Sequence, residues 1–192
     1  MKKILLLTLP LALAATTPAL AHINPAEHGS FGAGFSHPIS GADHMLAMVA
    51  VGLWAVLLGG RAMWLVPAAF VGTMIAGFLL AIAGVKLPFA EPAILASVVA
   101  IGLFAAVALK VPTSLAMALV GFFALFHGYA HGSEMGTATA GSYLLGFALA
   151  TTLLHVTGLA AGALLGAGIG RAIVRVAGAS TAFIGLWLAL GA

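Results

Sequence analysis

Residues 114–134 read SLAMALVGFFALFHGYAHGSE, an apolar run over residues 114–131 that carries two histidines at its end and a glutamate just beyond. A helix needs roughly 20 such residues to cross the core of a bilayer. Comparable apolar segments occupy residues 41–58, 63–83, 93–109, 140–166 and 172–190. Glycine, proline and basic residues fill the short breaks between them, as expected where helices end. The sequence therefore predicts an all-α polytopic membrane protein with six transmembrane helices.

The composition supports this prediction. Charged residues make up 6% of the 192 residues and the mean hydropathy is +1.22, whereas soluble domains contain roughly 25% charged residues. Most of the chain is therefore expected to lie in the lipid bilayer and to contact lipid. The length leaves room for one compact bundle and for no separate soluble domain.

The first 21 residues, MKKILLLTLPLALAATTPALA, have the pattern of a cleavable signal peptide. Two lysines precede a short apolar run, which ends in a small-x-small cleavage pattern, Ala19-Leu20-Ala21. An uncleaved first membrane helix is the alternative, but Pro10 interrupts the run. Residues 22–192 then form a single domain of six transmembrane helices. Without Lys2 and Lys3 the net charge falls from +3 to +1, five basic against four acidic residues, which argues against a nucleic-acid partner.

The basic residues predict the orientation in the membrane. If the mature N-terminus lies outside, the cytoplasmic loops carry Arg61, Lys110, Arg171 and Arg175, and Lys86 alone lies outside. This bias agrees with the positive-inside rule. We therefore expect a multi-pass protein of the bacterial inner membrane with a periplasmic N-terminus and C-terminus. The two histidine-rich segments of the chain, residues 37–44 and 126–134, then both lie at the outer face.

One of these segments is FHGYAHGSE, residues 126–134. His127 and His131 are four residues apart, so a helix places them on one face, and Glu134 continues that face if the helix persists. Imidazole and carboxylate are ligands for first-row transition metals. The chain has no cysteine, so any metal must be held mainly by nitrogen and oxygen ligands. The alternative is that these histidines only reach toward the membrane interface.

The other segment is HPISGADH, residues 37–44. His37 precedes a proline, which favours an extended conformation at His37 and a helix that begins at Pro38. Asp43 then lies near the positive end of a helix dipole. Asp43 and His44 point about 100° apart on a regular helix, so we expect one of them to orient the other and not to share the ion with it. The alternative is that Asp43 is only a partner of the helix dipole and His37 only a helix cap.

Three further histidines are weaker metal-ligand predictions. His155 lies deep in the segment at 140–166, where it either bonds to a neighbouring helix or serves the ion path. His22 becomes the N-terminal residue after cleavage and offers an amine and an imidazole to one ion. With Glu27 and His28 it could form an outer capture site.

At these two segments the chain resembles the HupE/UreJ family of small membrane proteins, which are associated with hydrogenase and urease systems and regarded as nickel permeases. The resemblance spans the mature start AHINPAEHGSFGAGFSHPISGADHMLAM, the helices and FHGYAHGSE. Neither segment departs from the family pattern. The resemblance implies a metal-binding role for His37, Asp43, His44, His127, His131 and Glu134.

The implied function is that of a secondary permease, and not of an enzyme, that imports a divalent first-row metal for hydrogenase or urease maturation. The resemblance favours Ni²⁺ as the transported substrate, with Co²⁺ or another divalent metal as alternatives, and implies no organic cofactor. Maturation proteins of those enzymes are the implied functional partners. A membrane metalloenzyme of the di-iron or zinc type, and a haem- or metal-binding sensor, are the rival functions. Whether the chain forms a homo-oligomer, and whether the two segments build one site or two, stay open.

Overall fold

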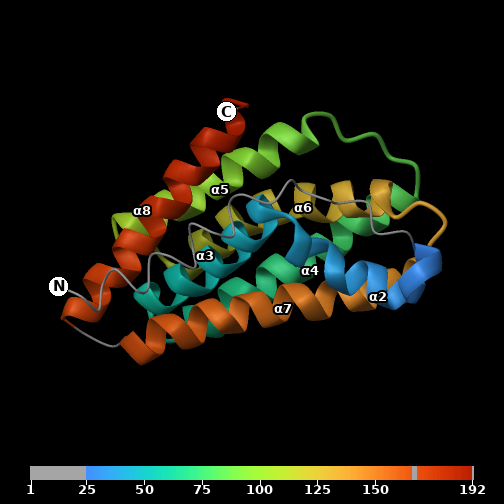
Figure 1. Cartoon of the computed structure of the whole chain (residues 1–192). Helices are drawn as coiled ribbons and strands as arrows, with labels where there is room; N and C mark the ends of the chain where they lie inside the picture. The colour runs from blue at the N-terminus through green and yellow to red at the C-terminus, as the bar shows by residue number, and fades with distance from the viewer. Residues whose placement is uncertain (1–24, 166–167, 192) are drawn as a thin grey trace.

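The structure is a computed structural model that describes residues 25–165 and 168–191, and every regular element in those ranges is a helix (Figure 1). The helices are α2 (Pro25–Ser40), α3 (Ala42–Leu58), α4 (Ala62–Ile82), α5 (Ala90–Ala106), α6 (Thr113–Glu134), α7 (Ala140–Leu165) and α8 (Ile169–Ala189). The all-α prediction is confirmed for this part of the chain. The predicted signal peptide and His22 lie outside the described residues.

The six predicted apolar segments coincide with α3 to α8 within a few residues. By length and composition, α4, α6, α7 and α8 are each able to cross a membrane. The pair α2 and α3 also passes this test, but only as one span bent by 79°. The helix α5 has 17 residues and is short for a full crossing. The chain is therefore a multi-pass helical membrane protein, and four or five helical units in its described part have full spanning length.

The helix α2 corrects the prediction for His37 and Pro38. Neither an extended His37 nor a helix start at Pro38 is found, because α2 continues through both residues and ends at Ser40. The break lies instead at Gly41, whose backbone is extended (φ −94°, ψ 120°). Packing overrides the local preference: a Cβ atom at Gly34 would overlap the backbone oxygen of Tyr143, so α2 lies directly against α7.

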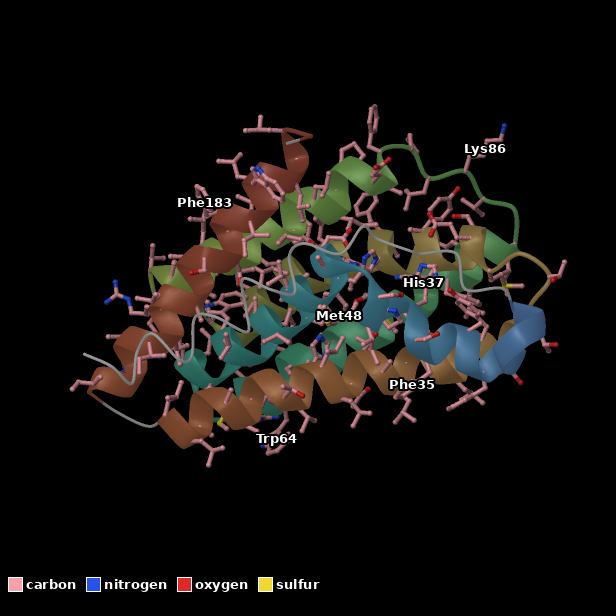
Figure 2. The ribbon with its side chains drawn as sticks, viewed as in Figure 1. Phe35, His37, Met48, Trp64, Lys86 and Phe183 are labelled. Atoms are coloured by element: carbon pink, nitrogen blue, oxygen red, sulfur yellow. The ribbon has the colours of Figure 1, made fainter. Side chains whose placement is uncertain are left out.

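The closest helix pairs among the described residues are α4 with α6, α5 with α8, and α7 with both α2 and α3. In each of these pairs glycines let the two backbones meet, as already seen for α2 and α7 at Gly34. A Cβ atom at Gly52 would collide with the backbone of α7, one at Gly128 with that of α4, and one at Gly102 with that of α8. Close approach through small residues is the usual way in which membrane helices associate. Outward-facing apolar side chains such as Trp64 and Phe183 cover the exterior (Figure 2).

Two basic side chains mark one end of the bundle. The Lys110 ammonium donates to the backbone oxygen of Leu57, and the Arg175 Nε donates to the backbone oxygen of Ala106 at 2.8 Å. Both cations therefore cover the carbonyl end of a helix, where positive charge is favourable. At the opposite end, where Glu134 lies, Ser30 Oγ accepts a bond from the backbone N–H of Thr139 at 2.8 Å.

Candidate metal site

Four histidines from the two predicted segments meet inside the bundle. The His131 ring lies 4.5 Å from the rings of His37 and His44, centroid to centroid, and His44 lies 4.9 Å from His127. They come from α2, α3 and α6, and we call these four residues the histidine cluster. Figure 2 shows His37 turned into the bundle, unlike the outward-facing Trp64. The structure thus brings the two segments together into one cluster.

The local structure explains this convergence. The four-residue spacing puts His127 and His131 on the same face of α6, as predicted. The glycines next to these histidines let α4 pack closely against α6. A Cβ atom at Gly128 would overlap the backbone oxygen of Met74, so α4 fills the space beside Gly128 and no ion fits there. The bend at Gly41 then lets His37 and His44, on either side of it, both reach α6.

The cluster holds ring nitrogens without protein partners. Both nitrogens of His131, Nε2 of His44 and Nδ1 of His127 are buried and have no hydrogen-bond partner among the described residues. A buried polar atom left without a partner typically costs about 1–3 kcal/mol, and such atoms are rare in folded proteins. Several of them in one place indicate lone pairs that are available to a ligand. A metal cation fits this set, because neutral imidazole nitrogen is a good ligand for first-row metals.

Glu134 adds a carboxylate at the outer edge of this cluster. The helix α6 persists through Glu134, which was the condition for its joining the histidine face. Its Oε2 lies 3.7 Å from His37 Nε2. One ligand atom each from His37, His131 and Glu134 lie within 4.8 Å of one another, a spacing that could hold one ion. The Glu134 side chain is exposed and His131 is fully buried, so this group leads from the surface inward.

Asp43 orients His44, as the helix geometry predicted. The Asp43 Oδ1 lies 2.9 Å from His44 Nδ1 and also accepts the backbone N–H of His44 at 2.9 Å. A carboxylate is an acceptor, so it favours the tautomer of His44 that carries its proton on Nδ1. The lone pair of His44 is then on the buried Nε2, which has no protein partner. Asp43 therefore acts on the cluster through His44.

Ser97 of α5 plays the same part for His127 and was not among the residues predicted from the sequence. Its hydroxyl lies 2.6 Å from the backbone oxygen of Ile94 and 2.8 Å from His127 Nε2. The Ile94 oxygen can only accept, so the hydroxyl donates there and accepts from His127 Nε2–H. The lone pair of His127 is then on Nδ1. One signal could have pointed to Ser97: it carries the single hydroxyl in the apolar segment 93–109.

Replacing Ser97 tests this assignment. We expect Ser97→Ala to weaken the binding of a divalent first-row metal by about ten-fold, because residues that orient metal-bound histidines typically contribute 10–100-fold to affinity. Titration calorimetry on purified protein measures the change. Ser133→Ala is the matched control, since the Ser133 hydroxyl bonds only backbone oxygens of its own helix. Equal affinities of both variants and the parent would remove Ser97 from the site.

Among the weaker predictions, His155 lies outside the histidine cluster. His155 is buried in α7 and its ring lies 5.0 Å from Phe70, which in turn lies 5.5 Å from His127. Neither His155 nitrogen bonds to another described residue, so the predicted bond to a neighbouring helix is not found. His28 lies near the start of α2. The outer capture site formed by His22, Glu27 and His28 stays a prediction.

Comparisons with known proteins agree with the sequence resemblance. A sequence model of the family described as HupE / UreJ protein matches residues 9–188. The chain is also similar to "Protein HupE" of Rhizobium leguminosarum bv. viciae, with 46% identity over 181 residues, which covers 94% of either chain. No solved structure matches the chain. Because the family match extends over nearly the whole length, the chain belongs to the HupE / UreJ protein family.

Proposed function

We propose that the chain is a secondary permease of the bacterial inner membrane that imports Ni²⁺ for hydrogenase or urease maturation. The observation that carries this proposal is the histidine cluster, four imidazoles from three helices that meet inside a membrane bundle. Family membership supports an accessory metal permease in general terms. In this proposal residues 1–21 act as a cleaved signal peptide and six helices cross the membrane.

The ligand set indicates which class of ion binds, but it does not single out one metal. His37, His44, His127 and His131 supply nitrogen and Glu134 supplies oxygen, which suits a divalent first-row metal. By the usual order of affinities, such a site also binds Cu²⁺ and Zn²⁺. The choice of Ni²⁺ therefore rests on the family, with Co²⁺ as the second substrate to test. A site with several weak ligands also allows release, which a closed four-ligand cage resists.

The membrane potential is a sufficient driving force for such a carrier. A divalent ion that moves inward gains about 4.6 kcal/mol per 100 mV, twice the value for a single charge. The sequence contains no phosphate-binding loop for a nucleotide. In our proposal the protein therefore needs no ATP and provides only a selective path across the bilayer.

The proposed orientation in the membrane can be tested with reporter fusions. A reporter fused after Lys110 should be cytoplasmic and one fused after Glu134 should be periplasmic, because the cations that cover α3 and α5 belong at the inner face. Alkaline phosphatase, which is active only outside the cytoplasm, reports one location, and green fluorescent protein reports the other. The reverse pattern would place the histidine cluster at the cytoplasmic face and make it a release site.

Uptake of radiolabelled Ni²⁺ and Co²⁺ into metal-limited cells, with and without the chain, tests the function itself. We expect nickel uptake to rise when the chain is present and to need no partner subunit. A chain that reaches the membrane and leaves the uptake of both metals at background would contradict the proposal. Purified protein with a haem absorption band would favour the sensor alternative.

A further inference from the structure

A second group of unpartnered polar atoms lies beneath the histidine cluster, on α7. Thr151 Oγ1 and both ring nitrogens of His155 are buried and have no hydrogen-bond partner among the described residues. The two residues are four apart, so they share one face of the helix. Both are fully buried, with exposures of 0% and 1%. This face of α7 therefore offers one hydroxyl oxygen and one imidazole to a ligand.

Neighbouring threonines show that this arrangement is not a general property of α7. The hydroxyl of Thr152 donates to the backbone oxygen of Ala148 at 2.7 Å, and that of Thr157 donates to Leu153 at 2.8 Å. Such bonds to the preceding turn are the ordinary way in which a helix satisfies a hydroxyl. Thr152 and Thr157 are exposed, whereas Thr151 is buried and its hydroxyl makes no such bond.

The depth of these residues follows from the helix rise of 1.5 Å per residue. His127 lies seven residues from the end of α6 at Glu134, or roughly 10 Å along that helix. Measured along their own helices, Phe70 lies roughly 18 Å from the outer end of α4, and His155 roughly 22 Å from that of α7. The Phe70 ring contacts both histidines, at 5.5 and 5.0 Å. His155 is thus the next imidazole inward.

We infer that Thr151 and His155 form a second, inner station for the same divalent cation, which receives it from His127 past the side of the Phe70 ring. This inference rests on the proposed permease function and adds a step to it. The station has two protein ligands, so water or backbone oxygens complete the coordination and the ion is held weakly. Weak, successive sites are what conduction requires, because each ion must leave as readily as it binds.

Comparing binding with transport tests the inner station. Full-length protein in detergent is titrated with Ni²⁺, and the same protein in liposomes is assayed for radiolabelled Ni²⁺ uptake. We expect His155→Leu to bind Ni²⁺ as the parent does, since the histidine cluster is intact, but to transport it at least about ten-fold more slowly. Thr151→Val removes only the hydroxyl and should slow uptake several-fold. Thr152→Val is the matched control and should change neither quantity.

Each other outcome counts against the inference in a distinguishable way. Parental uptake by both His155→Leu and Thr151→Val would remove the station and leave the permease proposal intact. Loss of Ni²⁺ binding together with uptake, at an unchanged unfolding temperature, would assign His155 to the outer site. If His155→Leu does not fold, Thr151→Val decides alone, and parental uptake overturns the inference. A parent chain that neither binds nor transports Ni²⁺ removes the proposed function and the station with it.

Discussion

His131→Ala should nearly abolish nickel uptake. The loss should exceed the roughly 10–100-fold in metal affinity or activity that is typical when a residue hydrogen-bonded to a metal ligand is replaced. His131 is the centre of the histidine cluster: its ring lies 4.5 Å from both His37 and His44, and both its nitrogens are buried without partners. The initial rate of radiolabelled Ni²⁺ uptake measures the effect. Variant and parent must first be matched for the amount of folded protein in the membrane.

The double variant shows whether the cluster acts as one site. Residues that share one ion act as a unit, so their losses are strongly non-additive. Adding His44→Ala to His131→Ala should therefore cost little more, and each single variant should resemble the double. If the two variants gave partial defects that multiply, His44 and His131 would belong to separate stations along the path.

Gly128→Leu should prevent the bundle from folding. Its Cβ atom would overlap the backbone oxygen of Met74, so α4 and α6 would have to separate along their whole contact. Overpacking of a flexible core costs about 1–3 kcal/mol, and a clash with backbone, which cannot rotate away, costs more. We expect an aggregated or degraded product in size-exclusion chromatography of the detergent extract.

Gly72→Leu in α4 is the control for Gly128→Leu. A Cβ atom at Gly72 meets nothing within 4 Å, and the residue is exposed on the outer surface of the bundle. This variant should extract and unfold as the parent does. Equal behaviour of the two glycine variants would contradict the close packing of α4 against α6.

The six apolar helices were predictable from sequence because lipid solvation imposes a simple pattern. A membrane helix must satisfy its own backbone and present apolar side chains, so α3 to α8 are visible as apolar runs between turn residues. The pairing of His127 with His131 was equally predictable, since it depends only on the helical period. Glu134 required one more fact, the end of α6, which apolarity alone does not fix.

What the sequence could not supply were features that depend on tertiary contacts. The local rule for a residue before proline gave the wrong conformation at His37, because packing of α2 on α7 outweighs it. The bend at Gly41 decides that His37 and His44 both reach His131, and no local pattern encodes its angle. The bond between Ser97 and His127 joins residues 30 apart, so only the packing of α5 on α6 reveals it.

Nickel K-edge X-ray absorption on the purified protein, loaded with one equivalent of Ni²⁺, tests the shared metal site most directly. We expect back-scattering from more than one imidazole, together with oxygen ligands, because the His131 ring contacts those of both His37 and His44. The imidazole contribution should fall in His44→Ala and in His131→Ala alike, since the two come from different segments of the chain. A spectrum without imidazole scattering, or one that neither substitution changes, would contradict the site.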